Sequence, residues 1–369
     1  MTHSLFSPLT LRDLTIENRI VVSPMCQYAS VEGSATDWHL MHLGSLAMGA
    51  AGLLMVEMTN VTPEGRISPR CATLCTDENE TALARIVAFC RTYGTAKLGM
   101  QIAHAGRKGS MQPPAEGGMP LTPEKGGWET VAPSAIPFME GWPTPRELSV
   151  EDIHKLIDDH VASVIRADRL GFDLVEMHGG HGYLIHQFLS PLSNRRTDQY
   201  GGSLENRMRF PLEAFRAMRA ALSPSKPLGI RLSATDWVDG GWSIEDAVIF
   251  ARELKAIGCD FIDTTTGGLD PRQKIPLAPG YQVPFSARIR READIVTMTV
   301  GLIDKPAQAQ AIVSANDADC IMIGRGVLYD PRWAWHAAEA LRAETAYPAK
   351  YRVCQPSLRP ELFPHPLED

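Results

Sequence analysis

The chain has 369 residues and a formal net charge of -7, from 36 basic and 43 acidic side chains. This length suits one large α/β domain or two ordinary ones, and the mild acidity argues against nucleic acid as the main partner. The hydrophobic fraction of 44% and the charged fraction of 21% are ordinary for a soluble globular enzyme.

The sequence also argues against a membrane span, a secretory signal and disulfides. No run of about 18 apolar residues predicts a membrane helix, and the amino terminus lacks the basic and apolar segments of a secretory signal. The seven cysteines are an odd number without paired spacing. This favours a reduced, cytoplasmic protein over a disulfide scaffold or a zinc site.

Apolar runs that predict strands alternate with segments that predict helices along most of the chain. The strand candidates are bounded by Gly, Pro or Asp, as expected of strands covered on both faces. They are Ile20–Ser23, Leu53–Glu57, Leu98–Ile102, Phe172–Met177, Leu228–Leu232, Phe261–Thr264, Ile295–Val300 and Cys320–Ile323. The helix candidates are Asp37–Gly49, Glu78–Tyr93, Val150–Leu170, Leu204–Leu222, Ser243–Ile257, Pro306–Ala315 and Pro331–Glu344.

This alternation predicts a TIM (β/α)8 barrel over residues 1–345. A doubly wound open sheet is the alternative, but no dinucleotide-binding glycine fingerprint follows the first strand. Residues 105–145, after the third strand, are rich in Gly and Pro and are expected to form a capping insertion. Residues 346–369 are expected to form a tail that lies at a surface or a subunit interface.

Two histidines and a tyrosine leave the end of the fourth predicted strand together. His178, His181 and Tyr183 stand where barrel enzymes carry their active sites. The two histidine N–H groups could hold one carbonyl or phenolate oxygen, and Tyr183 could donate a proton. Capping of a loop and metal binding are the other interpretations, but no clear carboxylate or cysteine partner stands at ligand spacing.

Other predicted strand ends carry further polar side chains. Cys26 and Tyr28 follow the first strand, although a lone cysteine is more often a small core residue. Gln101 ends the third strand and offers an amide that can pair with the edge of a heterocycle. Arg231, at the end of the fifth strand, is costly to bury without an anionic partner.

The loops after the last two strands complete this pattern. Gly301 follows the seventh strand, and Gly324 and Arg325 follow the eighth, where this fold often binds phosphate. Together the strand ends predict a phosphate site, a site for a polar heterocycle near the first three strands, and an oxygen-binding pair. This combination predicts FMN across the mouth of the barrel with a substrate stacked on it.

Several long motifs resemble the Old Yellow Enzyme family of flavin-dependent ene-reductases, in particular its bacterial subclass of thermophilic-like enoate and xenobiotic reductases. They occur in the family's order through nearly the whole chain: Leu5–Leu9, Asn18–Ile20, Pro24–Tyr28, Gln101–Arg107, His178–Leu184, Phe188–Pro191, Asn194–Ser203, Asn206–Arg207 and Gly324–Arg325.

The resemblance implies an enzyme in which NADPH, or NADH, reduces FMN, and hydride then passes to the β-carbon of an activated alkene such as an enone, a maleimide or a nitro-compound. It implies that His178 and His181 hold the substrate oxygen and that Tyr183 supplies the proton, with Tyr28 also on the substrate side. Cys26 is expected to tune the flavin potential. The residues expected to contact the flavin are Ser23, Pro24, Met25, Cys26, Asn60, Gln101, Arg231, Gly301, Gly324 and Arg325.

Other functions remain to be weighed against this one. A xenobiotic reductase acting mainly on nitro-compounds or nitrate esters is one alternative, and a non-catalytic flavin-binding protein or a flavin-free barrel isomerase are others. The iron–sulfur branch of the family is disfavoured because no cysteine cluster stands near the end of the chain. The family further implies a homo-oligomer, a dimer or tetramer, in which Arg352 could reach a neighbouring active site. No metal, nucleic acid or membrane partner is expected.

Overall fold

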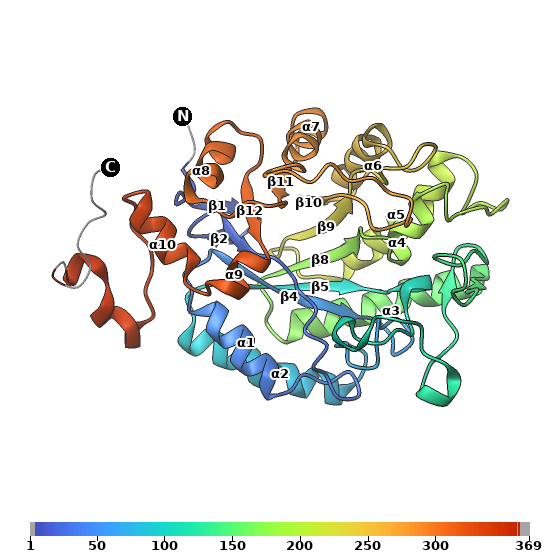
Figure 1. Cartoon of the computed structure of the whole chain (residues 1–369), viewed down its shortest axis with the longest axis horizontal. Helices are drawn as coiled ribbons and strands as arrows, with labels where there is room; N and C mark the ends of the chain where they lie inside the picture. Colours follow the sequence, from blue (N-terminus) through green and yellow to red (C-terminus); the bar gives the residue numbers. More distant parts are fainter. Residues whose placement is uncertain (1–3, 360, 362–369) are drawn as a thin grey trace.

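The chain folds into a closed barrel of parallel strands surrounded by helices (Figure 1). The computed structural model describes residues 4–359 and 361. The barrel strands follow the order β10-β11-β12-β3-β4-β5-β8-β9. Their bounds are β3 (Ile20–Val22), β4 (Leu53–Asn60), β5 (Lys97–Ala103), β8 (Leu174–Gly179), β9 (Leu228–Ser233), β10 (Phe261–Thr265), β11 (Val296–Thr299) and β12 (Cys320–Ile323). Each predicted strand overlaps one of these, so the predicted TIM barrel is confirmed.

A hairpin that the sequence analysis did not predict closes the amino end of the barrel. It consists of the antiparallel strands β1 (Leu9–Leu11) and β2 (Leu14–Ile16). Its buried side chains join one apolar cluster with barrel side chains such as Leu53, Leu174 and Phe261. Because this end is filled by packing, only the carboxyl ends of the strands are open to a ligand.

Ten helices cover the barrel or connect its strands in the described part of the chain. They are α1 (Asp37–Ala47), α2 (Asp77–Tyr93), α3 (Val150–Arg169), α4 (Leu184–Leu189), α5 (Leu204–Ala221), α6 (Ile244–Ala256), α7 (Val283–Ala293), α8 (Pro306–Ser314), α9 (Arg325–Tyr329) and α10 (Trp333–Ala340). Ser243 caps α6 by accepting a hydrogen bond from the backbone N–H of Asp246 at 3.2 Å.

The segment after β5 departs from the barrel repeat, as predicted. It forms the 3-10 turns η1 (Gly106–Lys108), η2 (Pro114–Glu116) and η3 (Pro123–Lys125) and the short strands β6 (Val131–Ala132) and β7 (Arg146–Glu147). Arg107 donates to the backbone oxygen of Leu269 at 3.0 Å. This contact ties the insertion to the loop that follows β10, on the open side of the barrel.

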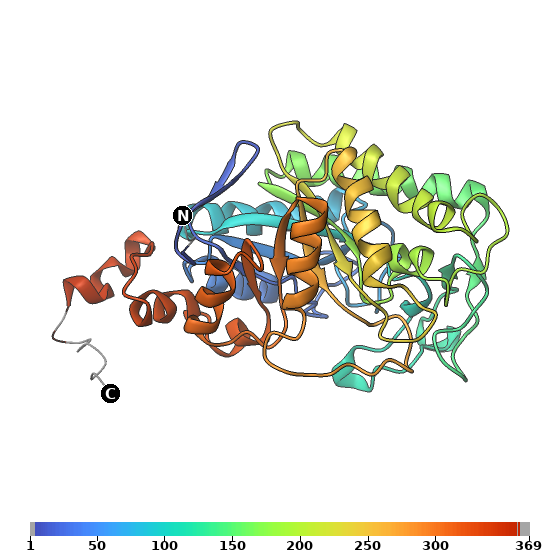
Figure 2. The same cartoon turned by 90° about the horizontal axis from the view of Figure 1, so that it is seen from above.

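The end of the chain leads away from the barrel beyond α10 (Figure 2). Two 3-10 turns, η4 (Ala349–Cys354) and η5 (Pro356–Leu358), form its described part. The Arg332 guanidinium lies 4.8 Å from the ring centroid of Trp335 and 5.7 Å from that of Tyr351, which anchors η4 to α10. Within the predicted tail 346–369, residues 360 and 362–369 lie outside the described part of the chain.

Candidate active site

The residues that the sequence analysis singled out gather at the carboxyl ends of the barrel strands. A cavity of about 780 Å³ opens there, and its wall includes His181, Arg231, Gly301, Gly324 and Arg325. These residues come from distant parts of the sequence. Parallel strands bring them together because all their carboxyl ends face the same side of the barrel.

One end of the cavity is suited to a phosphate. Arg325 makes no ion pair with any residue that the structure describes. A Cβ added to Gly324 would lie in ordinary van der Waals contact with Met25 Sδ, at 3.5 Å. Gly301 has a φ of +123°, and a Cβ there would lie 2.9 Å from Gln282 Nε2, which requires glycine. A guanidinium beside glycine backbone in the wall of a cavity fits a phosphate group.

The loop after β3 and the end of β4 carry buried polar atoms without a partner in the described part of the chain. Ser23 Oγ, after β3, and Asn60 Oδ1, at the end of β4, have no hydrogen-bond partner within the described chain. The amide nitrogen of Asn60 donates to the backbone oxygen of Ala72 at 2.9 Å, so only the oxygen is available. An unsatisfied buried polar atom costs about 1–3 kcal/mol. The polar ring edge of a flavin fits these atoms and would remove that cost.

Cys26, in the loop after β3, is a neutral thiol. Burial, followed by Cys71 and Glu57, raises the pKa of its thiol well above the ordinary value. Since the thiolate is the nucleophilic form of cysteine, Cys26 has none of the character of an activated nucleophile. The aromatic side chains of Tyr28 and Tyr183 pack against the same apolar cluster as Cys26.

The two histidines are neutral and lie edge to face. Their ring centroids are 5.2 Å apart with an interplanar angle of 88°. His178 Nε2 lies 3.4 Å from His181 Nδ1, and His181 Nε2 lies 3.0 Å from Thr265 Oγ1. Burial, followed by the charge of Arg231, lowers the pKa of both imidazoles well below the ordinary value. Both histidines therefore act as neutral hydrogen-bonding groups at neutral pH.

Tyr183 faces the same histidines, and its phenol keeps its proton. Its ring centroid is 5.1 Å from that of His178, with an interplanar angle of 77°. Burial raises the pKa of Tyr183 well above the ordinary value. A phenol that stays protonated beside a neutral, hydrogen-bonding imidazole can donate its proton to a substrate.

Lys108, which the sequence analysis did not single out, holds this loop in place. Its ammonium donates to the backbone oxygens of His181 and Gly268, both at 2.8 Å. Its Nζ also lies 5.1 Å from the ring centroid of Tyr183. Burial, followed by the neighbouring Arg107, lowers the pKa of Lys108 to about 8. In the sequence, only its position next to the motif Gln101–Arg107 could have indicated that Lys108 belongs to the site.

Two glycines allow the histidine loop to approach the loop after β10. A Cβ added to Gly182 would lie 2.2 Å from the backbone oxygen of Gly268, and one added to Gly268 would lie 2.6 Å from His181 Cα. Both glycines also have positive φ, at +72° and +92°. Side chains at either position would push the two loops apart and displace His181.

Beneath the site, the barrel interior holds a layer of polar and ionisable side chains, in which sequence reasoning singled out Gln101 and Arg231 but missed Glu176 and Asp263. Gln101 Nε2 donates to Glu176 Oε1 at 2.7 Å, and Arg231 Nε lies 3.1 Å from Asp263 Oδ2. Burial raises the pKa of both carboxyl groups, and Asp263 raises that of Glu176 further. Strand alternation was the available signal, because Glu176 stands two residues before His178 and so shares its face.

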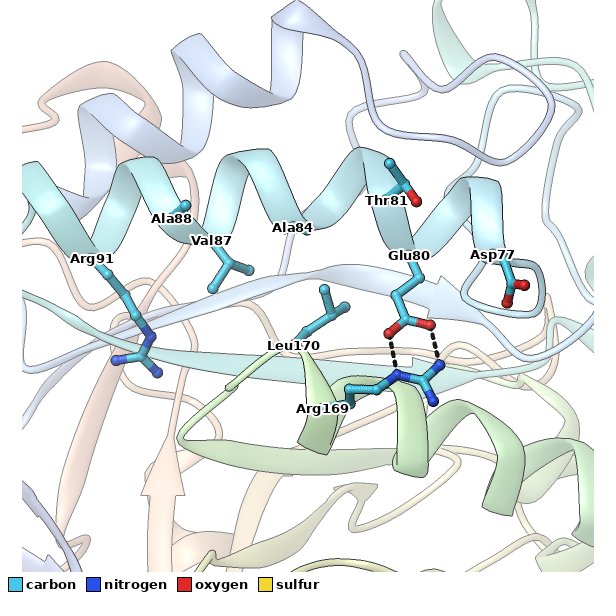
Figure 3. Close-up of a pocket in the computed structure, with 9 residues that line it drawn as sticks. All are labelled: Asp77, Glu80, Thr81, Ala84, Val87, Ala88, Arg91, Arg169 and Leu170. Atoms are coloured by element: carbon cyan, nitrogen blue, oxygen red, sulfur yellow. Dashed lines mark hydrogen bonds and ion pairs between the residues drawn. The ribbon is translucent and has the colours of Figure 1, made fainter.

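A second cavity lies on the outside of the barrel, between α2 and the end of α3 (Figure 3). Its charged groups pair with one another: Glu80 accepts from Arg166 Nη1 and from Arg169 Nε, both at 2.6 Å. With its charges paired in this way, this surface offers no reactive group. Among the described residues, no group of His, Cys, Asp and Glu side chains could hold a metal ion, and no helix is long and apolar enough to cross a membrane.

Comparison with known proteins decides the family. The model of the NADH:flavin oxidoreductase / NADH oxidase family matches residues 4–344. The chain belongs to this family. It is 42% identical over 353 residues to an NADPH dehydrogenase of Geobacillus sp. (strain WCH70), covering 95% of this chain and 98% of that protein. It is 44% identical over 349 residues to an NADPH dehydrogenase of Listeria innocua, covering 94% and 98%.

Solved structures agree with this membership. Morphinone reductase in complex with tetrahydroNAD superimposes with a TM-score of 0.75 at 28% identity, over 94% of this chain and 92% of that one. The Old Yellow Enzyme resemblance, the oxidoreductase class and the FMN cofactor expected from the sequence are thereby confirmed. The chain is an FMN-dependent oxidoreductase whose reductant is a reduced nicotinamide nucleotide.

Proposed function

We propose that this protein is an ene-reductase that uses NADPH and FMN to reduce activated alkenes such as enones, maleimides and nitro-compounds. The observation that carries the proposal is the convergence of His178, His181 and Tyr183 beside one cavity, with both histidines neutral and the phenol protonated. The NADPH dehydrogenases to which the chain is similar support NADPH as the reductant.

In this proposal FMN, when bound, supplies the hydride for the β-carbon of the alkene. His178 and His181 hold the carbonyl or nitro oxygen, where negative charge develops during the transfer. Donors that are fixed around the oxygen once the alkene has bound stabilise such charge better than water does, because they need not reorganise during the hydride transfer. Tyr183 gives its proton to the α-carbon, and Tyr28 lines the substrate side.

Four of the residues proposed to hold FMN line the same cavity: Arg231, Gly301, Gly324 and Arg325. The loop after β3, with the ends of β4, β5 and β9, faces the ring, and the loops after β11 and β12 bind the phosphate. The ring-contacting residues are Ser23, Pro24, Met25, Cys26, Asn60, Gln101 and Arg231, and the phosphate-binding residues are Gly301, Gly324 and Arg325. The unpartnered Ser23 Oγ and Asn60 Oδ1 support the first group.

We also propose that the chain works as a cytoplasmic homo-oligomer with residues 346–369 at a subunit interface. All seven cysteines are free, which suits a reducing compartment. In the described part of the tail, Val353 is 68% exposed and Leu358 is 47% exposed. Apolar side chains at such exposure support a contact with a second subunit, which Arg352 would join.

Anaerobic stopped-flow measurements test the proposed function. NADPH should bleach the flavin absorbance of the purified protein, and cyclohex-2-enone should restore it. Bound flavin that NADPH fails to bleach would instead identify a non-catalytic flavin protein, and a colourless protein would favour a flavin-free barrel enzyme. Faster reoxidation by nitro-compounds or nitrate esters than by any enone would favour the xenobiotic reductase alternative.

A further inference from the structure

A continuous series of hydrogen bonds leads from the histidine loop to the far wall of the cavity. The backbone N–H of Gly180 lies 3.2 Å from His178 Nδ1. A backbone N–H can only donate, so this nitrogen carries no proton and the neutral His178 carries its proton on Nε2. His178 Nε2 therefore donates to His181 Nδ1, and His181 in turn carries its proton on Nε2 and donates it to Thr265 Oγ1.

The series continues to the backbone of the seventh barrel unit. Thr265 Oγ1 donates to Gln282 Oε1 at 3.1 Å, and Gln282 Nε2 donates to the backbone oxygen of Val300 at 3.0 Å. Gln282 Oε1 accepts a second hydrogen bond from Thr266 Oγ1 at 2.8 Å. Thr265 and Gln282 are buried, so water does not compete freely for these contacts.

In this arrangement His181 offers no N–H group to a ligand between the two histidines. Its Nδ1 is an acceptor, and its only N–H group faces Thr265. An oxygen held by both histidines needs His178 Nε2–H and His181 Nδ1–H together. His181 must therefore change tautomer when such a ligand binds.

We propose that Thr265 is a positioning residue whose hydroxyl selects the tautomer of His181. When its O–H turns from Gln282 Oε1 to His181 Nε2, that nitrogen becomes an acceptor and the imidazole proton stands on Nδ1, directed at the ligand oxygen. One proton leaves Nε2 for water and one arrives at Nδ1 from water, so no net proton is bound. The inference rests on the proposed function, because it assumes that the histidine pair holds the substrate oxygen.

The contacts around Thr265 keep the free-energy cost of this rotation low. When the hydroxyl of Thr265 turns away, Gln282 Oε1 keeps the hydrogen bond from Thr266, so no buried acceptor is left without a partner. The rotation turns a single side-chain bond and moves no backbone. His181, Thr265 and Gln282 all line the same cavity, so a ligand that enters it can reach this end of the series.

The test compares Thr265→Val, which removes the hydroxyl at nearly constant shape, with the matched control Thr265→Ser, which keeps it. Oxidised holoenzyme is titrated with cyclohex-2-enone, and binding is followed by the change in flavin absorbance. Thr265→Val should raise the Kd about tenfold, which corresponds to one lost hydrogen bond, whereas Thr265→Ser should bind like the wild type. ¹⁵N NMR of histidine-labelled holoenzyme should show the His181 proton on Nε2 without the enone and on Nδ1 with it.

Thr266→Val is a second test, which does not depend on whether Thr265→Val folds. Thr266→Val leaves Gln282 Oε1 dependent on Thr265 alone, so it should weaken enone binding about threefold. An unchanged Kd in Thr265→Val, or a His181 tautomer that is the same with and without enone, would overturn the inference. Wild-type holoenzyme that neither binds the enone nor is reoxidised by it would instead overturn the proposed function.

Discussion

Tyr183 is the residue whose replacement separates the two halves of the proposed reaction. Tyr183→Phe keeps the ring that faces His178 at 5.1 Å but removes the proton. A positioned general acid contributes about 10²–10⁴-fold to rate, so reoxidation by cyclohex-2-enone should slow by that order. Flavin reduction by NADPH needs no proton from Tyr183 and serves as the internal control in the same stopped-flow experiment. Equal slowing of both halves would contradict the role of proton donor.

Glu176 makes the stability of the fold depend on pH. Burial raises its pKa above the ordinary 4.5, so the folded state keeps this proton at pH values where the unfolded chain has lost it. The free energy of unfolding should therefore fall as pH rises above 4.5, by up to about 1.4 kcal/mol per pH unit. Glu176→Gln keeps an acceptor for Gln101 but cannot ionise, so its stability should fall less.

Urea unfolding of wild type and Glu176→Gln from about pH 5 to about pH 8 checks the predicted fall of the unfolding free energy with rising pH. The two curves of unfolding free energy should diverge as pH rises, with the variant the more stable at the alkaline end. Burial also raises the pKa of Asp263, so the unfolding free energy of the variant should still fall in part as pH rises. Parallel curves would show that Glu176 does not carry the proton.

Site residues were predictable where neighbours in sequence form the site. His178, His181 and Tyr183 occupy one short loop after a strand, so their contact follows from local spacing. Lys108 reaches the same loop from the insertion after β5, and Thr265 reaches it from the end of β10. Which of their atoms meet depends on strand register and on side-chain packing across the barrel, and neither leaves a local pattern in sequence.

At the scale of one element, the buried and exposed faces of helix α6 contribute differently to the free energy of unfolding. Phe250 is 0% exposed and packs edge to face on Trp242 with ring centroids 6.1 Å apart, whereas its neighbour Ile249 is 40% exposed. Phe250→Ala should lower the free energy of unfolding by about 3–5 kcal/mol. Ile249→Ala, on the same helix, is the matched control and should cost less than about 1 kcal/mol. Similar losses in thermal or urea unfolding would contradict the packing of α6 on the barrel.

Elements were predictable when their pattern was long enough to read. The barrel strands stood out because strands covered by helices contain continuous apolar runs, such as Leu53–Val56 in β4, where every residue is buried. The strands β1 and β2 have three residues each, too few to show alternation. Helix α7 was missed because its run of arginines hides the apolar face, although Pro284 in its first turn is typical of a helix start.

At the scale of the whole molecule, the architecture separates folding from cofactor binding. The hairpin β1–β2 fills the amino end of the barrel, and apolar side chains of the strands pack in large clusters with those of the surrounding helices. Polar residues at the carboxyl ends, such as Ser23 and Asn60, keep buried atoms without a partner in the described part of the chain. Removal of FMN should therefore leave the far-ultraviolet circular dichroism unchanged, while FMN at about one hundred times its Kd should add about 2.7 kcal/mol to the free energy of unfolding.

Comparing riboflavin with FMN shows which part of the site is responsible for binding and stabilisation by FMN, because riboflavin has the ring of FMN without the phosphate. Arg325 lines the cavity and makes no ion pair within the described chain. Arg325→Ala should weaken FMN binding by about tenfold to a hundredfold, the usual worth of a charge-assisted hydrogen bond, and should leave riboflavin binding as it is in the wild type. Fluorescence titration of the apoprotein with both flavins measures this. Equal weakening for the two flavins would place Arg325 at the ring instead of the phosphate, and the loops after β11 and β12 would lose their proposed role.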